Sequence, residues 1–306
     1  MDAQVAEWKH RFDLAGVAEI VDGEGGLAKI VVTAPEASAE VYLHGAQVTS
    51  WRPAGAEEVL FLSERSRWED GRAIRGGIPV CFPWFRDKAD DPAAPAHGFV
   101  RTRAWRLEGM AYEAGEVVLT LATASDASTR KWWPYEFRLE HRIAVGAALG
   151  LRLTVTNTGS TPWRFEEALH TYHRVGDATM VTVAGLEGQP YLDNMDGNRE
   201  KTQEGEIAFT RQTDNAYLGT EHALAVKDPV LGRQITTEKE NARTTVAWNP
   251  WKEGAGALAD LGDEAWQRMV CVEAANMRSD AVWLEAGQEH AMQATLKVEA
   301  LSSSAA

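Results

Sequence analysis

The sequence is poor in cysteine, and it lacks the usual metal-binding spacings. Two of its 306 residues are cysteines, Cys81 and Cys271, and each lies between apolar neighbours in PVCFP and MVCVE. Such thiols are typical of buried, reduced cysteines. Neither CxxC nor HExxH is present, so the sequence predicts no redox role and no metal site. No cofactor is implied.

Basic residues and long apolar runs are also scarce. The 31 lysines and arginines face 45 acidic residues, which gives a net charge of −14. A general nucleic-acid or anionic-membrane binder would show a basic face instead. No run approaches the length of a membrane span, and residues 1–14 carry charges where a signal peptide needs an apolar run. We therefore expect no nucleic-acid or membrane partner, a cytoplasmic location and a monomer.

Alternation of apolar and polar residues dominates the chain after a short helical segment at Val5–Leu14. Phe137–Val145 and Leu149–Val155 alternate cleanly and are joined by a turn, which predicts a hairpin with one buried face. The other expected strands are Leu27–Val32, Ala39–Leu43, Val59–Leu62, Val117–Leu121, Met180–Val183, Leu224–Val226, Thr244–Trp248, Val282–Leu284 and His290–Leu301.

The order of these segments predicts an all-β protein. Helices are few, no βαβ rhythm is present, and no linker divides the chain. These features favour one antiparallel β-sandwich or barrel domain over residues 1–306. The final SSSAA, residues 302–306, is expected to be frayed.

The run WRFEEALHTYHRV, Trp163–Val175, is dense in titratable groups and is expected to form one short strand. In an extended segment His170 and Tyr172 share one face, and His173 points to the other. One histidine is therefore expected to do chemistry. The alternative, that both are ordinary hydrogen-bonded histidines of intermediate burial, stays open.

Two long loops are chemically dense. In Trp68–Trp105 the glycines Gly76 and Gly77 follow Arg75, and we expect them to let the backbone and guanidinium approach a ligand closely. The aromatic residues of this loop could stack on a sugar or belong to the core. The acidic segment Gly185–Gly205 is either a lid or rim of a site or a solvated hairpin loop.

Six motifs resemble, in chain order, the sequence blocks of the D-hexose-6-phosphate mutarotases, or glucose-6-phosphate 1-epimerases, of the aldose 1-epimerase superfamily. They are RGGIPVCFPWF (Arg75–Phe85), HGFVR (His97–Arg101), LHTYH (Leu169–His173), TDNAY (Thr213–Tyr217), WNPW (Trp248–Trp251) and RMVCVEAAN (Arg268–Asn276). The match runs from about His44 to Gln293. The resemblance implies a large antiparallel β-sandwich of the galactose mutarotase type with few short helices.

The resemblance also implies roles for individual residues. The family's catalytic histidine and glutamate fall on His170 and Glu273, and its sugar-contacting aspartate falls on Asp214. Its substrate- and phosphate-binding positions are Arg75, His97 and Arg101. Two positions depart from the family pattern, because Arg86 follows PWF where glycine is expected and His173 replaces an aromatic residue.

These residue types suit anomerisation, which needs one group to take a proton from the anomeric hydroxyl and another to give one to the ring oxygen. Our hypothesis makes Glu273 the base and His170 the acid, with His97 as a second donor. Alternatives remain open: His170 as a core histidine, Glu273 as a solvent-exposed turn residue, and Asp214 as a turn cap. Arg75 and Arg101 could instead pair with the nearby acidic residues Glu69, Asp70, Asp87, Asp90 and Asp91.

The expected activity is therefore that of an isomerase that interconverts the α and β anomers of a hexose 6-phosphate. Two guanidinium groups could outweigh the acidic net charge at short range and bind its phosphate. Rival functions are an aldose 1-epimerase for unphosphorylated sugars, a non-catalytic carbohydrate-binding β-sandwich, and a glycoside hydrolase using Glu273 and Asp214. The sequence does not rank Arg72, Arg86 and Arg103 as further phosphate contacts.

Overall fold

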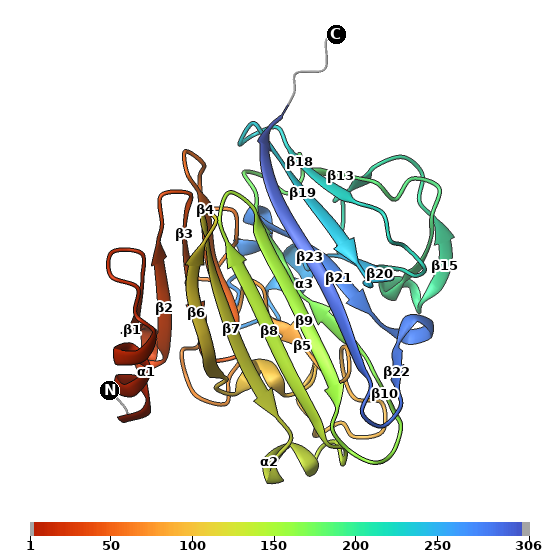
Figure 1. Ribbon diagram of the computed structural model, residues 1–306. Coiled ribbons are helices and arrows are strands. Elements are labelled where there is room, and N and C mark those ends of the chain that lie inside the picture. The colour runs from red at the N-terminus through yellow and green to blue at the C-terminus, as the bar shows by residue number, and fades with distance from the viewer. Residues whose placement is uncertain (1–2, 302–306) are drawn as a thin grey trace.

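The computed structural model describes residues 3–301, so the expectation for the terminal SSSAA falls outside the described part. Its largest sheet has nine strands and fills the front of the view in Figure 1. The strands follow the order β16 (Ile207–Ala208), β13 (Thr182–Ala184), β18 (Leu224–Asp228), β19 (Arg233–Glu240), β23 (Glu289–Ala300), β9 (Leu149–Asn157), β8 (Phe137–Val145), β7 (Glu116–Ala124) and β6 (Arg106–Glu113).

A second sheet of eight strands lies behind the first in Figure 1. Its order is β15 (Arg199–Thr202), β14 (Pro190–Asp193), β17 (Thr213–Tyr217), β20 (Thr244–Asn249), β21 (Met269–Asn276), β11 (Glu167–Leu169) and β5 (Val80–Cys81), and β12 (Tyr172–Arg174) also pairs with β21.

Smaller elements complete the fold within residues 3–301. A four-stranded sheet runs β1 (Ala18–Asp22), β2 (Ala28–Thr33), β3 (Ala37–Tyr42) and β4 (Gln47–Pro53), and β10 (Trp163–Phe165) pairs with β22 (Val282–Leu284). The helices are α1 (Ala3–Phe12), α2 (Ala127–Arg130) and α3 (Trp251–Ala255), with 3₁₀ turns η1 (Glu24–Gly26), η2 (Val100–Thr102), η3 (Asn194–Asp196), η4 (Ala265–Arg268) and η5 (Arg278–Asp280). None of the helices in this described part is long and apolar enough to cross a membrane.

Alternation along the strands builds the core between the two large sheets. In β8 and β9 the residues of one face are buried and most of those on the other are partly exposed. The same apolar cluster contains Leu139 and Leu153 of the nine-stranded sheet and Val270 and Val272 of the eight-stranded sheet. All strand ladders in the described residues are antiparallel. The predicted all-β antiparallel sandwich and the β8–β9 hairpin are therefore confirmed.

The eight-stranded sheet is covered on both faces near its centre. Every residue of β21 is buried. Val270 and Val272 belong to the core between the sheets, whereas Met269 and Cys271 belong to a separate cluster with Tyr172 on the other face. By the two-residue period of a strand, Glu273 lies on this second face. The candidate site is built there.

Two expected strands are wrong in detail. Val59–Leu62 makes only isolated bridges, from Leu60 and Leu62. Trp163–Val175 is not one strand but three, because β10 pairs with β22, β11 with β21 and β5, and β12 with β21 alone. Changes of partner break the run, and no local pattern in the sequence encodes them. The loop expected at Gly185–Gly205 contains the β14–β15 hairpin at the edge of the eight-stranded sheet.

Candidate active site

The bend between β11 and β12 places His170 beside Glu273. Both strands pair with β21, on either side of the bend. His170 Nε2 lies 3.4 Å from Glu273 Oε1. The structure thus joins two titratable groups that lie about a hundred residues apart in the chain.

This pair is buried and incompletely satisfied. His170 is 6% exposed and Glu273 is 1% exposed. His170 Nδ1 and Glu273 Oε2 have no hydrogen-bond partner among the described residues. Buried polar atoms without partners are uncommon and call for an explanation such as a ligand or a catalytic role.

Burial also decides the charge of the pair. It raises the pKa of Glu273 well above its ordinary value, and the charge of Asp214 acts in the same direction. It lowers the pKa of His170 well below its ordinary value, and Arg101 and Arg75 add to that shift. Burial therefore favours the uncharged form of both groups.

Aromatic rings hold the His170 imidazole in place. It stacks on Tyr172 with ring centroids 4.8 Å apart and an interplanar angle of 11°. Trp248 meets its edge at 6.0 Å, and the His97 ring lies at 5.5 Å. Tyr172 shares the His170 face as predicted. A ring confined in this way presents its nitrogens in one orientation.

His97 is fixed by the backbone of Arg86. The Arg86 N–H points to His97 Nδ1 at 3.3 Å, and the His97 N–H donates to the Arg86 carbonyl at 2.7 Å. Both residues have φ of 62°, an uncommon conformation for residues other than glycine. Because Nδ1 accepts, the neutral ring carries its proton on Nε2. Burial, with Arg101 next, lowers the pKa of His97 well below its ordinary value, so the ring is a neutral N–H donor.

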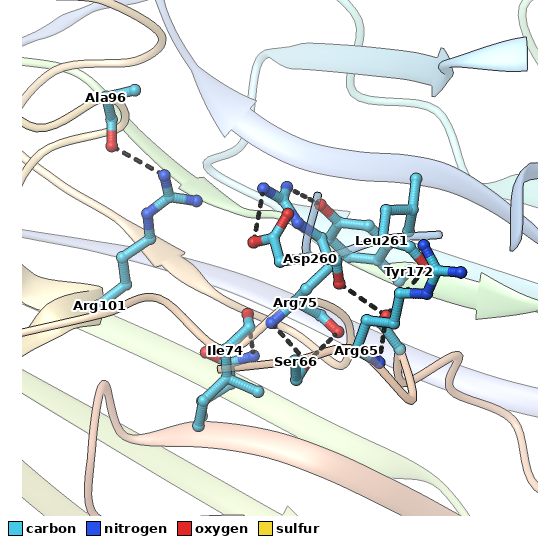
Figure 2. A network of polar contacts seen from close by, with 11 residues as sticks. Arg65, Ser66, Ile74, Arg75, Ala96, Arg101, Tyr172, Asp260 and Leu261 are labelled. Atoms are coloured by element: carbon cyan, nitrogen blue, oxygen red, sulfur yellow. Dashed lines mark hydrogen bonds and ion pairs between the residues drawn. The ribbon is translucent and has the colours of Figure 1, made fainter. Parts of the chain in front are cut away.

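Arg75 is held at both ends. Ser66 Oγ accepts from the Arg75 N–H and donates to the Arg75 carbonyl, each at 3.0 Å. The guanidinium donates to the Tyr172 hydroxyl at 3.1 Å and lies 3.1 Å from an oxygen of Asp260. Figure 2 shows these contacts. Arg75 is thus ion-paired, but with a residue of a distant loop and not with any of the nearby acids considered from the sequence.

The glycines after Arg75 serve packing. A Cβ on Gly76 would lie 2.4 Å from the Phe61 carbonyl oxygen, and one on Gly77 would lie 2.2 Å from that of Val48. Their φ angles of 118° and 62° also favour glycine. Close approach at these positions is made to neighbouring backbone, and the expectation that they also let a ligand approach stays a prediction.

Arg101 has no carboxylate partner among the described residues. Its guanidinium donates to the Ala96 carbonyl at 2.8 Å, as Figure 2 shows, and its buried Nε has no acceptor. Burial lowers the pKa of Arg101, although a guanidinium keeps its charge at any physiological pH. Arg101 is therefore a cation that can still accept an anionic ligand.

Asp214 lies in β17 and not in a turn. One of its oxygens pairs with Arg86 and the other accepts from the Asn194 side chain at 2.8 Å. Burial raises the pKa of Asp214 and Arg86 opposes that shift. Arg86, which the sequence left unranked, thus belongs to the site, and Asn194 brings the β14–β15 hairpin to its rim.

The other unranked residues lie elsewhere. Arg103 pairs with Asp126, the N-cap of α2, and Arg72 is exposed. Trp84 packs against Phe99, and Phe85 packs against the His97 ring with centroids 4.7 Å apart. Both aromatic residues are buried, Trp84 in the main core and Phe85 in a separate apolar cluster with Ala168 and Ala275.

His173 lies on the opposite face, as its spacing from His170 predicts. It is fully buried, and its strand neighbours Val270 and Leu60 belong to the main core. Burial lowers the pKa of His173 to about 4. Its ring is therefore a neutral core group and does not reach the His170–Glu273 pair.

Sequence reasoning missed Asp260, Trp248 and Asn194 as neighbours of the site. Trp248 was noted only as part of the WNPW block. Asp260 follows α3 in a loop without periodicity or a motif, so no local signal could have found it. Among residues 3–301 no three His, Cys, Asp or Glu side chains are grouped as metal ligands.

The chain matches known proteins over most of its length. The family model for aldose 1-epimerase matches residues 28–297. A Cenchrus ciliaris protein provisionally named glucose-6-phosphate 1-epimerase is 35% identical over 283 residues, which cover 89% of this chain and 85% of that protein. One of the same name from Escherichia coli K12 is 36% identical over 247 residues, covering 80% and 82%.

Solved structures agree. The Salmonella typhimurium protein YeaD, provisionally described as a mutarotase, superposes with a TM-score of 0.88 at 31% identity, covering 94% of this chain and 96% of that one. A galactose mutarotase-like protein from Clostridium acetobutylicum shares the fold, with a TM-score of 0.70 at 14% identity and coverage of 92% and 98%. The fold is thus that of the galactose mutarotase-like β-sandwiches. This chain belongs to the aldose 1-epimerase family, and it is an isomerase.

Proposed function

We propose that this protein interconverts the α and β anomers of hexose 6-phosphates, with glucose 6-phosphate as the first candidate. The observation that carries the proposal is the buried His170–Glu273 pair, 3.4 Å apart, in a site whose Arg101 lacks a carboxylate partner in the described chain. The names of the two relatives support the phosphorylated substrate.

The two catalytic groups share one proton. As the ring opens, histidinium His170 gives its proton to the ring oxygen while Glu273 takes the proton of the anomeric hydroxyl, so the C1–O bond breaks and C1 becomes an aldehyde. The pair is then a neutral imidazole and a carboxylic acid, and burial favours these uncharged forms. After rotation about C1–C2, both protons return as the ring oxygen attacks the other face.

The charge of the substrate phosphate favours the protonated His170 that the first step needs. Arg101 and Arg75 help to keep the pKa of His170 low in the empty site. A phosphate dianion on these arginines offsets their charge, which favours the histidinium that the ring-opening step needs. His97, with its proton on Nε2, supplies a second donor toward the ring oxygen.

The phosphate is held by Arg75 and Arg101 in this proposal, and Asp214 contacts the sugar. Guanidinium groups bind phosphate oxygens with charge-assisted hydrogen bonds, and both arginines have a buried Nε that lacks an acceptor in residues 3–301. The sugar ring then extends toward His170 and Glu273.

The test compares glucose with glucose 6-phosphate. Starting from one pure anomer, polarimetry or exchange NMR gives kcat/KM for each sugar after subtraction of the spontaneous rate. We expect a clear preference for the phosphate. Equal specificity constants would remove the role of Arg75 and Arg101 and leave an aldose 1-epimerase for unphosphorylated sugars.

The cytoplasmic location and the monomeric state stay predictions from charge and composition. Size-exclusion chromatography with light scattering measures the second directly, and a mass of 33.6 kDa is expected.

A further inference from the structure

Asp260 occupies a position that an anionic ligand of Arg75 would take. Its Oδ2 lies 3.1 Å from Arg75 Nη2, and about a fifth of each side chain is exposed. Figure 2 shows this carboxylate beside the Arg75 guanidinium, with Arg101 on the other side of the view. The pair is therefore at the surface of the site, where a ligand can reach it.

The charge of Asp260 is felt by both arginines. Tyr172 and then Asp260 raise the pKa of Arg75 against the opposing effect of burial. Burial lowers the pKa of Arg101, and Asp260 opposes that shift. The Asp260 carboxylate thus occupies an anion position on Arg75.

The inference rests on the proposed function. We propose that Asp260 is an internal competitor for the substrate phosphate: it holds Arg75 in the empty site and is displaced when the dianion binds. Two like-charged groups cannot share one guanidinium without repulsion, so binding requires the carboxylate to turn away.

The surroundings of Asp260 allow that movement. Ser63 Oγ donates to the carbonyls of Asp260 and Leu261 at 2.7 and 3.0 Å, so this anchor holds the backbone and not the carboxylate. About a fifth of the Asp260 side chain is exposed, and Arg75 is its ion-pair partner in the described residues. The carboxylate can therefore turn toward solvent once another anion occupies Arg75.

This competition acts on every phosphate ligand. An unphosphorylated sugar leaves the Arg75–Asp260 pair intact, whereas inorganic phosphate and a hexose 6-phosphate must both displace Asp260. The contacts of the sugar ring offset that cost for the hexose 6-phosphate alone. Asp260 thus keeps the affinity for free phosphate low.

The experiment uses the full chain with Asp260→Asn, and Asp263→Asn as the matched control from the same loop, because Asp263 is exposed and has no ion-pair partner among the described residues. Calorimetry with inorganic phosphate gives Kd, and anomerisation assays give kcat and KM for glucose 6-phosphate and glucose. We expect Asp260→Asn to lower the Kd for phosphate about tenfold, since that removes one competing charge at short range. KM for glucose 6-phosphate falls, and Asp263→Asn keeps the wild-type values.

A Kd for phosphate that is unchanged or higher in Asp260→Asn would overturn the proposal and make Asp260 a positioning residue for Arg75. In Asp260→Asn the new amide oxygen can still accept a hydrogen bond from Arg75. Asp260→Ala removes that acceptor as well and is expected to lower the Kd for phosphate at least as much. The wild-type preference between the two sugars is measured alongside. If it is absent, the proposed function fails; if it is present and phosphate affinity does not rise, only the role of Asp260 fails.

Discussion

The nine-stranded and eight-stranded sheets are built from the same kind of strand pairing, yet they differ in regularity. In the nine-stranded sheet β7, β8, β9, β19 and β23 have eight to twelve residues each. In the eight-stranded sheet β5, β11 and β12 have two or three residues, and β21 is buried on both faces. The first sheet separates core from solvent, and the second separates core from site.

This difference shows where a β-sandwich gains function. A regular ladder satisfies its own backbone groups and leaves side chains only two environments. The bend at His170 breaks the ladder between β11 and β12, and the His170 N–H donates instead to the Pro79 carbonyl at 3.0 Å. Such a break lets His170 of the bend, Glu273 of β21 and the distant Arg101 contribute to one site.

The largest expected effect comes from Glu273→Gln, which changes the eight-stranded sheet alone. The amide keeps the shape of the side chain but cannot take the anomeric proton. We expect kcat for glucose 6-phosphate to fall about 10²–10⁴-fold, the usual contribution of one general acid or base. Calorimetry should show binding of the sugar phosphate within about threefold of the wild type, because the phosphate contacts remain.

Glu238→Gln on β19 is the matched control. Glu238 is exposed and pairs with Lys297 on the outer face of the nine-stranded sheet. Its loss should leave kcat unchanged and alter stability by less than about 0.5 kcal/mol. Wild-type turnover in Glu273→Gln would show that the carboxylate is not the base.

A truncation in the core between the sheets should lower stability and leave activity unchanged, which is the opposite of the effect expected for Glu273→Gln. Leu153 of β9 is fully buried between the two large sheets and pairs with His141 and Met292. Leu153→Ala should lower the free energy of unfolding by about 2–5 kcal/mol, from lost burial and the cavity left behind. The specific activity of the folded fraction should not change, since the site lies on the far face of the other sheet.

Chemical denaturation and an activity assay on the same samples check this. Thr154→Ala is the control, because Thr154 is the next residue on β9 and points to the partly exposed face; we expect a change below about 0.5 kcal/mol. A large loss of activity in folded Leu153→Ala would mean that packing between the two sheets controls the geometry of the site.

The same contrast explains how far the sequence could be read. The alternation in Phe137–Val145 predicted the bounds of β8, because each residue of a half-buried strand reports its own environment. Trp163–Val175 was predicted as one strand because its breaks arise from changes of partner strand. Resemblance to a family pointed to His170 and Glu273, and the structure places them together. Asp260 and the Arg86–Asp214 pair could not be predicted, since both depend on contacts between distant loops.

Two arginines that lie two residues apart, Arg101 and Arg103, are expected to differ in their effect on activity. Arg101→Met removes a cation that has no carboxylate partner in the described residues, whereas Arg103→Met removes one that pairs with Asp126 outside the site. A charge-assisted hydrogen bond contributes about 1.5–3 kcal/mol. We therefore expect kcat/KM for glucose 6-phosphate to fall about ten- to hundredfold in Arg101→Met, mainly through KM.

Steady-state kinetics with glucose serve as the internal control, because an unphosphorylated sugar does not use the phosphate contacts. Its kcat/KM should change little in Arg101→Met, and Arg103→Met should resemble the wild type with both sugars. Equal losses for glucose and glucose 6-phosphate would assign Arg101 to the sugar ring and not to the phosphate.

The smallest effect concerns two buried histidines, one in each sheet. Burial lowers the pKa of His141 in β8 and of His173 in β12 to about 4. The unfolded value is about 6.5, so the unfolded chain binds more protons between these values, and the stability present above pH 6.5 is lost as the pH falls toward 4. At pH 5 the loss is about 2 kcal/mol for each histidine.

Urea denaturation at pH 7 and pH 5 tests this with His141→Gln and His173→Gln. Each variant should lose about 2 kcal/mol less than the wild type between the two pH values, because its side chain no longer takes up a proton on unfolding. If the pH dependence of the free energy of unfolding changes equally in both variants, burial of a histidine has the same free-energy cost in the two sheets. His173 is as buried as His141, and it is His170 that pairs with Glu273. The eight-stranded sheet would then differ from the nine-stranded sheet by the His170–Glu273 pair on its site face, and not by the burial of a histidine. A change confined to His173→Gln would instead locate the acid sensitivity in the sheet that carries the site.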